Sequence, residues 1–274
     1  MKPHKLTHGV YADEFAEFHC KDLRVRAAWG GFIPSAGVAT ALHREVIEQF
    51  RILRGEETFN PRCLTEDYFL GLEVNALGMR QIFSYEKDPE SGKHIATRSY
   101  FPATFKTAVR QRARWIAGNN LQSWERFGWR IEPRQLYWLW RDRKGLINQL
   151  PNLLAASLFL FGLTRWCWST ATGTSWALGE AITARPLLSG LLWANGGLVL
   201  WRLAFRVGLG WNLYGWRHAA LAPIRMVWAN IINFFASWRA VRAFATAKLH
   251  GKPLVWAKTA HSFPEMAKAH PSDE

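Results

Sequence analysis

Two helices are predicted by the spacing of apolar residues in the first third of the chain. Between residues 36 and 53, apolar side chains recur every three or four positions, as along the buried face of a helix. A second helix is expected from Cys63, with Thr65 as its N-cap and Gly78 at the position of a C-cap glycine. We expect the first of these helices to pack on a sheet.

A strand and a third helix are predicted next along the chain. Residues 80–85 have the pattern of a short strand, which a polar turn then closes. Pro102 and Thr104 open a helix that continues through Trp115. Helices that alternate with short strands are typical of an α/β layer, so α/β is the fold class expected for this part of the chain.

Three apolar runs in the second half are candidates for membrane helices. Residues 146–164 carry no formal charge and are flanked by arginines; at 1.5 Å per residue they extend roughly 28 Å, close to the thickness of a bilayer core. Residues 186–203 contain one charge, Arg202, near an end where its side chain can reach the interface. Residues 219–238 are less clear, because Arg225 lies inside them.

The distribution of cations predicts how these runs are oriented. The loop between the first two runs holds few cations, whereas the segments before the first and after the second are rich in arginine. This asymmetry places the first half of the chain in the cytoplasm. Cations flank both ends of the third run, so an interfacial or re-entrant helix is favoured over a third span. The alternative for these runs is a set of buried helices in a soluble protein.

Charge and tryptophan follow the same division of the chain. Residues 1–110 carry 15 Lys and Arg against 14 Asp and Glu, residues 111–274 carry 20 against 7, and only Trp29 of the 16 tryptophans lies before residue 115. Tryptophan and cations around apolar runs are typical of a membrane interface. A basic nucleic-acid binder is the alternative interpretation, but these cations bracket apolar runs and form no continuous polar stripe. No nucleic-acid partner is therefore expected.

Two short motifs combine groups that suit sugar transfer. Residues 65–67, Thr-Glu-Asp, begin the second predicted helix, where a carboxylate can act as general base toward an attacking hydroxyl. On the third predicted helix, Gln111, Arg114 and Trp115 share one face, because positions i, i+3 and i+4 are neighbours. A guanidinium can bind a pyrophosphate through two hydrogen bonds, and an indole can cover the apolar face of a sugar ring. The alternative is that these are ordinary core and surface residues.

At these motifs the chain resembles the membrane-embedded, processive-type family 2 glycosyltransferases, the group of the cellulose, chitin and hyaluronan synthases. The hallmarks of that group are a TED motif and a QxxRW motif just before transmembrane helices, and residues 65–67 and 111–115 match both in order. Within the group, residues 11–17 and 33–38 look like the bacteriophage adsorption protein B subfamily. Members of this subfamily are inner-membrane proteins linked to a surface polysaccharide that phages use.

The resemblance implies inverting transfer of a sugar, of the hexosyltransferase type, from a nucleotide sugar. Asp67 would be the catalytic base, with Glu66 and Thr65 beside it, and Trp115 would contact the acceptor sugar. The substrate-binding residues that the second motif implies are Gln111, Arg112, Arg114 and Trp115. The family's tail also carries a gating segment, whose counterpart would be Trp256, Lys258, Thr259 and His261; the alternative for this tail is a solvated surface.

The resemblance fails on the donor side. A complete catalytic domain of the family needs a DxD motif whose carboxylates hold Mg²⁺ or Mn²⁺ on the diphosphate, and no Asp-x-Asp occurs in the 274 residues. Mg²⁺ or Mn²⁺ is expected for the complete enzyme, with no ligand set within this chain. The chain thus looks like the C-terminal portion of such an enzyme, the acceptor half of a GT-A type domain followed by an α-helical membrane region. A separate N-terminal half would be its partner.

These expectations divide the chain into three parts. Residues 1–128 would be the C-terminal half of a cytoplasmic glycosyltransferase domain, residues 129–247 transmembrane and interfacial helices, and residues 248–274 a cytoplasmic tail. The expected function is that of a multi-pass enzyme of the bacterial inner membrane that acts on a nucleotide sugar, a glycan acceptor and a surface polysaccharide. The alternative is a noncatalytic membrane assembly or phage-adsorption factor that retains the glycosyltransferase scaffold.

Overall fold

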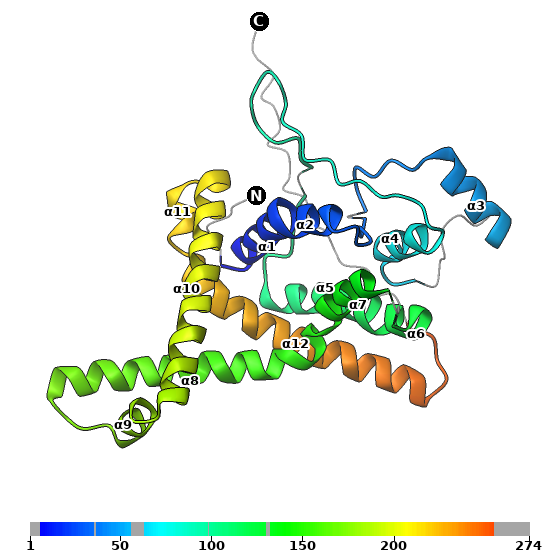
Figure 1. The fold of residues 1–274 in the computed structure, drawn as a ribbon. Helices are drawn as coiled ribbons and strands as arrows, with labels where there is room; N and C mark the ends of the chain where they lie inside the picture. Colours follow the sequence, from blue (N-terminus) through cyan, green and yellow to red (C-terminus); the bar gives the residue numbers. More distant parts are fainter. Residues whose placement is uncertain (1–5, 36, 56–62, 98, 130–131, 255–274) are drawn as a thin grey trace, which may run out of the picture.

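Helices are the regular elements of this protein. The computed structural model describes residues 6–35, 37–55, 63–97, 99–129 and 132–254, and these residues form no strand and no sheet (Figure 1). Their nearest approach to a sheet is an isolated antiparallel bridge between Lys87 and His94. The expected α/β arrangement, and with it the partial GT-A type domain, is therefore wrong for the described residues.

The described residues form a series of helices joined by turns and loops. The part of the chain before the first long apolar helix contains α1 (Leu6–Glu17), the π-helical turn η1 (Phe18–Asp22), α2 (Leu23–Ala28), α3 (Arg44–Arg54), α4 (Glu66–Ala76), α5 (Phe105–Ile116), the π-helical turn η2 (Ala117–Gln122), α6 (Ser123–Phe127) and α7 (Pro133–Arg143). The rest contains α8 (Gly145–Thr172), α9 (Ala177–Thr183), α10 (Pro186–Tyr214), α11 (Trp216–Ala219) and α12 (Ala222–Leu249).

The helices predicted around the two motifs are confirmed. Helix α4 follows Thr65, and Gly78 adopts a φ of +73° just after its end, as a C-cap glycine does. Helix α5 follows Thr104, whose hydroxyl accepts a hydrogen bond from the backbone amide of Thr107 at 3.3 Å. That bond satisfies one of the amides that a helix start leaves without a partner.

The helix predicted over residues 36–53 begins later than expected. Helix α3 starts at Arg44, and the residues before it form an irregular loop. Gly37 and Ala39 both have positive φ, which a right-handed helix excludes. The hydroxyls of Ser35 and Thr40 lie 2.7 Å apart and hold this loop closed.

The strand predicted over residues 80–85 is also wrong, and the hydrogen bonds of Gln81 give the reason. Oε1 of Gln81 accepts from the backbone amide of Ile33 at 3.0 Å, and Nε2 donates to the carbonyl oxygen of the same residue at 3.1 Å. A side-chain amide thus takes the place that a neighbouring strand would fill. The side chain of Gln135 binds the preceding backbone in a similar way: it accepts from the amide of Phe32 and donates to the carbonyl oxygen of Gly30. Residues 80–85 have the sequence pattern of a strand, but no other backbone segment pairs with them among the described residues. They therefore form no part of a sheet.

Close packing between α4 and the loop before α3 depends on Gly71. A Cβ at this position would lie 2.3 Å from the carbonyl oxygen of Ile33 and 2.8 Å from Cα of Pro34, which are backbone atoms that cannot swing aside. We expect Gly71→Ala to destabilise the protein by about 1–3 kcal/mol, although alanine is the better helix former. Denaturant titration of the full-length protein measures this, with Gly190→Ala as the control, because a Cβ at Gly190 meets no atom within 4 Å. Equal stability of the two variants would contradict the packing.

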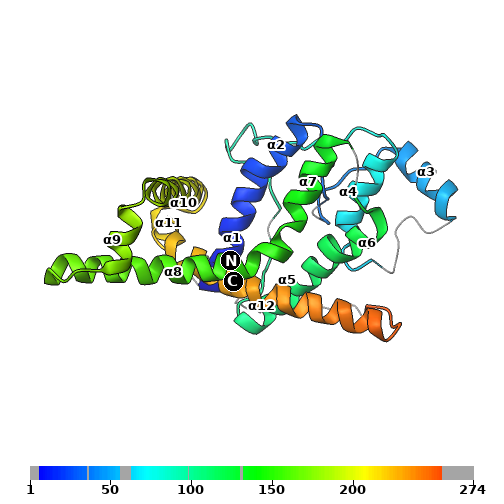
Figure 2. The same cartoon turned by 60° about the horizontal axis from the view of Figure 1, so that its bottom comes forward.

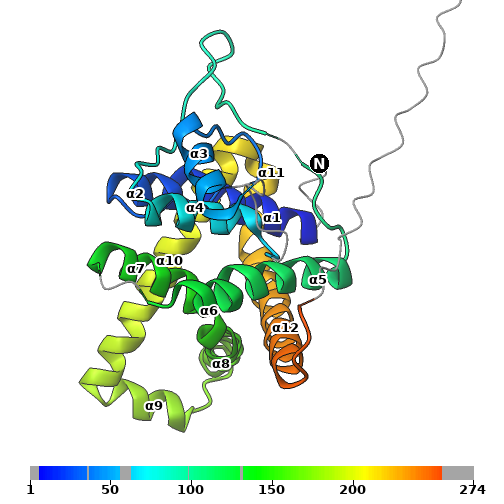
Figure 3. The same cartoon turned by 90° about the vertical axis from the view of Figure 1, so that its right-hand side faces the viewer.

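Helix α12 connects the two halves of the molecule. It packs along α5 and α1 and also contacts α8 (Figures 1 and 3). Where it crosses α5 and η2, four of the buried residues are alanines, which lets the backbones approach closely: Ala113, Ala117, Ala236 and Ala240. The third apolar run therefore lies against protein, and α12 is not one of the helices that are long and apolar enough to cross a membrane.

Two helices of the described residues do meet that criterion of length and composition. They are α8, with 28 residues, and α10, with 29. Helix α8 extends away from the other helices, α9 lies at its far end, and α10 returns toward α11 and α1 (Figure 1). Figure 2 shows α10 end-on while α8 lies across the view, so their axes diverge. No residue of α8 is buried, and α10 buries only Arg206 and Gly210, so both helices leave apolar surface uncovered.

Candidate active site

The TED sequence lies at the start of α4. Thr65 occupies the N-cap position, but its hydroxyl makes no capping hydrogen bond and has no partner among the described residues. Glu66 is exposed in the first turn, and Asp67 is half-buried. The positive end of the helix dipole stabilises negative charge at both positions. This turn therefore presents two carboxylates, of which only one is shielded from water.

The QxxRW helix meets this turn directly. Nη1 of Arg114 donates a hydrogen bond of 3.3 Å to the carbonyl oxygen of Leu64, the residue before the TED sequence. Four residues beyond Arg114, Gly118 lies against Thr65: a Cβ at this glycine would be 2.3 Å from Oγ1 of the threonine. Residues from both motifs, far apart in the sequence, are thus brought together where α4 contacts η2 and where Arg114 of α5 reaches the residue before the TED sequence.

The carboxylate of Asp67 is enclosed by backbone groups. Its Oδ1 accepts a hydrogen bond of 2.8 Å from the backbone amide of Tyr68. Gly37 approaches the other oxygen, where a Cβ would come within 3.1 Å of Oδ2. Burial raises the pKa of Asp67 and prevails over the Tyr68 hydrogen bond and the Arg114 charge, which lower it. A carboxylate with a raised pKa is a stronger base, which suits removal of a proton from a hydroxyl.

A pH dependence of any transfer by this site follows from these charges. Asp67 can accept a proton only when it is ionised, so we expect the rate to fall as the pH decreases. The midpoint of this fall should lie above 3.8, the ordinary pKa of aspartate, because burial raises the pKa of Asp67. The neighbouring charges act in opposite directions: Glu66 raises the pKa of Asp67 and Arg114 lowers it. The acid limb of kcat/KM should therefore move to lower pH in Glu66→Gln and to higher pH in Arg114→Gln. Shifts in the reverse directions would exclude Asp67 as the titrating base.

Trp115 is surrounded by aromatic side chains that come from two other segments. Its ring meets Tyr11 and Phe15 of α1 edge to face, with ring centroids 6.1 Å and 6.2 Å away, and Phe101 at 6.5 Å. Such geometry is favourable for aromatic pairs, so the half-buried indole is held in one orientation. Gln111 precedes it by one turn and is buried, and its Oε1 has no hydrogen-bond partner among the described residues.

Arg112, the variable position inside the second motif, turns away from the other motif residues. Its Nη2 lies 2.7 Å from Oε2 of Glu14, and its Nη1 donates to Oδ1 of Asn233 at 2.6 Å. The guanidinium also lies over the ring of Tyr11, 4.6 Å from its centroid. Burial by itself would lower the pKa of Arg112, but the charge of Glu14 outweighs it and raises the pKa. The side chain thus links α5 to α1 and α12, which differs from the substrate contact that the resemblance implies for it.

Tyr68, next to the candidate base, fixes the start of α4 against α7 and α2. Its hydroxyl donates to Oδ2 of Asp142 at 2.7 Å, and Nη2 of Arg26 lies 2.5 Å from Oδ1 of the same carboxylate. Burial raises the pKa of Tyr68 well above its usual value, so the phenol remains a hydrogen-bond donor. These three residues hold the backbone that carries Asp67.

The sequence motifs did not reveal several of these supporting residues. Gly37, in the loop before α3, lies against Asp67, and Gly118 of η2 lies against Thr65. Gly37 falls within residues 33–38, which the resemblance had singled out, but no sequence signal pointed to Gly118. Tyr68, Asp142 and Arg26 are separated by more than 40 residues in each direction, so no local spacing connects them. Their roles became visible only in the folded chain.

Metal binding finds no support in the described residues, and the expected gating segment lies outside them. These residues contain no group of three or more His, Cys, Asp and Glu side chains that could hold a metal ion. The described residues therefore do not fit the Mg²⁺ or Mn²⁺ expected for a complete enzyme. The four residues of the gating-like tail lie outside the described residues: Trp256, Lys258, Thr259 and His261.

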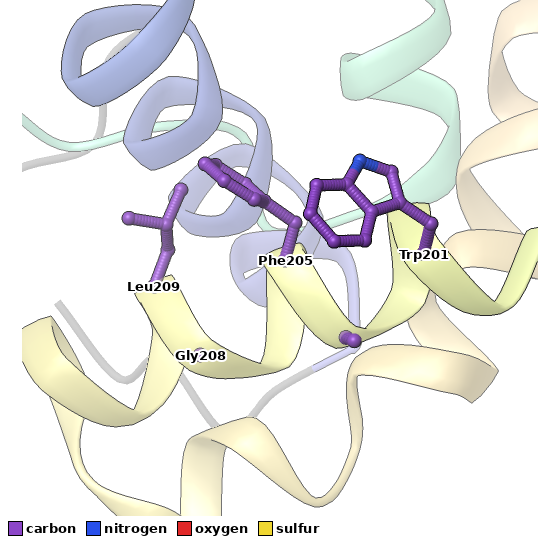
Figure 4. A pocket seen from close by; sticks show the side chains of 5 residues that line it. Trp201, Phe205, Gly208 and Leu209 are labelled. Carbon is purple, nitrogen blue, oxygen red and sulfur yellow. The ribbon is translucent and has the colours of Figure 1, made fainter. Parts of the chain in front are cut away.

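An apolar hollow of about 360 Å³ lies on α10, away from both motifs (Figure 4). Its lining consists of Trp201, Ala204, Phe205, Gly208 and Leu209. None of these residues belongs to the TED or QxxRW sequence, and the lining offers almost no polar group. The hollow is therefore not part of the candidate active site.

Comparison with known proteins agrees with the motifs. The family described as glycosyl transferase family group 2 matches residues 1–241. The chain is 35% identical over 278 aligned positions to bacteriophage adsorption protein B of Escherichia coli K12 and to bacteriophage N4 adsorption protein B of Escherichia coli O157:H7. These alignments cover 95% of this chain and 37% of each relative, so the chain spans little more than a third of their length.

No solved structure matches the chain. The family match extends over most of the chain and includes both motifs and both long apolar helices. The chain belongs to glycosyl transferase family group 2.

Proposed function

We propose that this chain forms the acceptor side of an inverting glycosyltransferase and that Asp67 is its general base. In the proposed step, the acceptor hydroxyl oxygen attacks the anomeric carbon of a nucleotide sugar. The bond from that carbon to the diphosphate oxygen breaks, the electron pair leaves with the nucleotide diphosphate, and the hydroxyl proton passes to Asp67. The observation that carries the proposal is the half-buried carboxylate with a raised pKa beside Arg114 of the second motif.

The other motif residues take supporting roles in this proposal. Trp115 would bind the apolar face of the acceptor sugar, because its indole is already oriented by Tyr11 and Phe15. Gln111 would supply a hydrogen-bonding group, since its buried Oε1 lacks a partner among the described residues. Arg114 would hold the turn before the TED sequence and add positive charge near the departing diphosphate.

We further propose that α8 and α10 lie in the inner membrane of a bacterium. The other described residues leave the apolar surfaces of both helices uncovered, and both helices exceed the roughly 20 residues that a bilayer core requires. The arginines before α8 and after the apolar part of α10 favour the cytoplasm for both motifs. The nucleotide sugar would then be drawn from the cytoplasm, and the growing surface glycan would be the acceptor.

The second candidate function is noncatalytic. The names of the two relatives refer to phage adsorption and to no reaction. In this alternative, the scaffold and its motifs support the assembly of a membrane complex or of a surface receptor for phage, and Asp67 has no catalytic role.

The two functions separate in cells that carry the full-length protein as their only copy. Surface glycan and phage adsorption are measured for wild type and for Asp67→Asn, with equal amounts of protein in the membrane. The enzymatic proposal predicts that the variant loses the glycan. A variant that retains both the glycan and the adsorption at wild-type levels would support the noncatalytic alternative.

A further inference from the structure

Helix α1 carries three acidic residues, and each pairs with a different part of the molecule. Asp13 pairs with residues of α11 and α12, Glu14 with α5, and Glu17 with α10. Figures 1 and 2 show α1 between α10 and α11 on one side and α5 and α7 on the other. Through these ion pairs, α1 contacts both the helix that carries the second motif, α5, and the apolar helix α10.

Asp13 is fully enclosed in the face of α1 that meets α11 and α12. Nε of Arg225 donates to Oδ2 at 2.7 Å and Nη2 to Oδ1 at 2.9 Å, while Nε2 of His218 lies 2.7 Å from Oδ1. The same Nη2 also donates to the carbonyl oxygen of His218 at 2.7 Å. A carboxylate bound by a guanidinium fork has little freedom to rotate, so α1 is anchored at its middle.

Glu17, one turn later on the same face, reaches α10. Its Oε2 lies 2.8 Å from Nη2 of Arg206, and its other oxygen is 2.5 Å from Nζ of Lys21. Burial alone would raise the pKa of Glu17, but the hydrogen bonds and charges of these two cations outweigh it and lower the pKa to about 2. Residues 186–205 of α10 extend roughly 30 Å, a bilayer core, so Arg206 is the first residue beyond that length.

The opposite side of α1 holds the second motif. Tyr11 and Phe15, also one turn apart, both contact Trp115, and Glu14 pairs with Arg112 at 2.7 Å. A helix is stiff over three turns, so a displacement at Glu17 is passed to Phe15 within the same turn. Any shift of α1 at Glu17 would therefore also move the rings of Tyr11 and Phe15 that lie against the indole of Trp115.

We propose that α1 couples the candidate acceptor site to the membrane helix α10, and that Glu17 is a positioning residue for Trp115. Loss of the Glu17–Arg206 pair would let α1 shift and would loosen the aromatic enclosure of the indole. The effect on catalysis rests on the function proposed above, whereas the effect on the order of α5 does not.

Hydrogen exchange of the full-length protein in lipid nanodiscs tests the coupling without any substrate. Glu17→Gln removes the charge and keeps the length of the side chain. We expect amide exchange in α5 to accelerate by about threefold or more, although among the described residues the carboxylate of Glu17 bonds to Lys21 and Arg206 and to no residue of α5. The control is Glu48→Gln, which breaks the exposed pair of Glu48 with Arg44 on α3 and should leave exchange in α5 unchanged.

Kinetics of sugar transfer give the second readout. With Glu17→Gln, the KM for the acceptor should rise while kcat and the hydrolysis of donor by water stay close to wild type, because the base and its surroundings are intact. If Glu17→Gln prevents folding, Arg206→Gln, which removes the other charge of the pair, is measured with the same expectations. Faster exchange confined to α1 and α10, with α5 as in wild type, would overturn the coupling. Faster exchange in α5 in a protein that transfers no sugar would sustain the coupling and refute the proposed function.

Discussion

Replacement of Asp67 by asparagine is expected to lower the rate of sugar transfer by the full-length protein by about 100- to 10,000-fold, the usual contribution of a general base. Asparagine has the same size and can still accept the 2.8 Å hydrogen bond from the amide of Tyr68. The start of α4 should therefore stay in place while the group that accepts the proton is lost. Rates are measured at saturating nucleotide sugar, together with a thermal unfolding curve for each protein.

The matched control for this variant is Asp88→Asn. Asp88 lies in the polar turn that precedes Lys93, and among the described residues its carboxylate accepts hydrogen bonds only from Glu90 and Ser91 of that turn. This change should leave the transfer rate within a factor of two of wild type. A folded Asp67→Asn protein that transfers sugar within tenfold of wild type would remove the proposed role of Asp67.

Loss of the buried charge at Asp13 is expected to have the largest effect on stability. Asp13, His218 and Arg225 have fully buried side chains, so Asp13→Asn leaves the guanidinium of Arg225 without its counter-ion inside the protein. Breaking a buried ion pair by removing one partner costs about 3–5 kcal/mol of the free energy of unfolding. Denaturant titration followed by tryptophan fluorescence measures this loss.

Two further variants distinguish the cost of leaving a buried charge unpaired from the cost of losing any ion pair in this part of the protein. Asp22→Asn removes a partly exposed carboxylate that pairs with Arg141 at 2.7 Å, and it should cost about 1 kcal/mol or less. The double variant Asp13→Leu with Arg225→Met removes both charges and should be less destabilised than Asp13→Asn alone. An Asp13→Asn protein as stable as the Asp22→Asn protein would show that the buried cluster does not anchor α1.

Local signals in the sequence predicted the elements that carry the motifs. The capping hydroxyl of Thr104 and the glycine after α4 appear as expected, because caps act within a few residues of the helix end. Thr65 takes the expected N-cap position, although its hydroxyl makes no capping hydrogen bond. The first two apolar runs likewise correspond to α8 and α10, since length and apolar composition are sufficient to predict such helices.

Features that depend on distant partners could not be read in this way. The alternation of residues 80–85 predicted a strand, but it could not reveal that the side chain of Gln81 binds the backbone of Ile33. The third apolar run contains Arg225, whose buried partner, Asp13, lies 212 residues earlier. Arg112 belongs to a motif by position, but Glu14 and Asn233 determine where it points. In each case the deciding contact is made with a residue far away in the sequence, which no periodic pattern of apolar residues can reveal.

The central claim, that the two motifs form the acceptor site of a glycosyltransferase, is tested most directly by a transfer assay with a panel of radiolabelled nucleotide sugars. The full-length protein is reconstituted in lipid vesicles, and label incorporated into glycan is compared for wild type and Asp67→Asn. We predict that at least one donor gives labelled glycan with the wild type and that the variant abolishes this product. Folded wild-type protein that transfers no sugar from any donor, or equal incorporation by the variant, would contradict the claim.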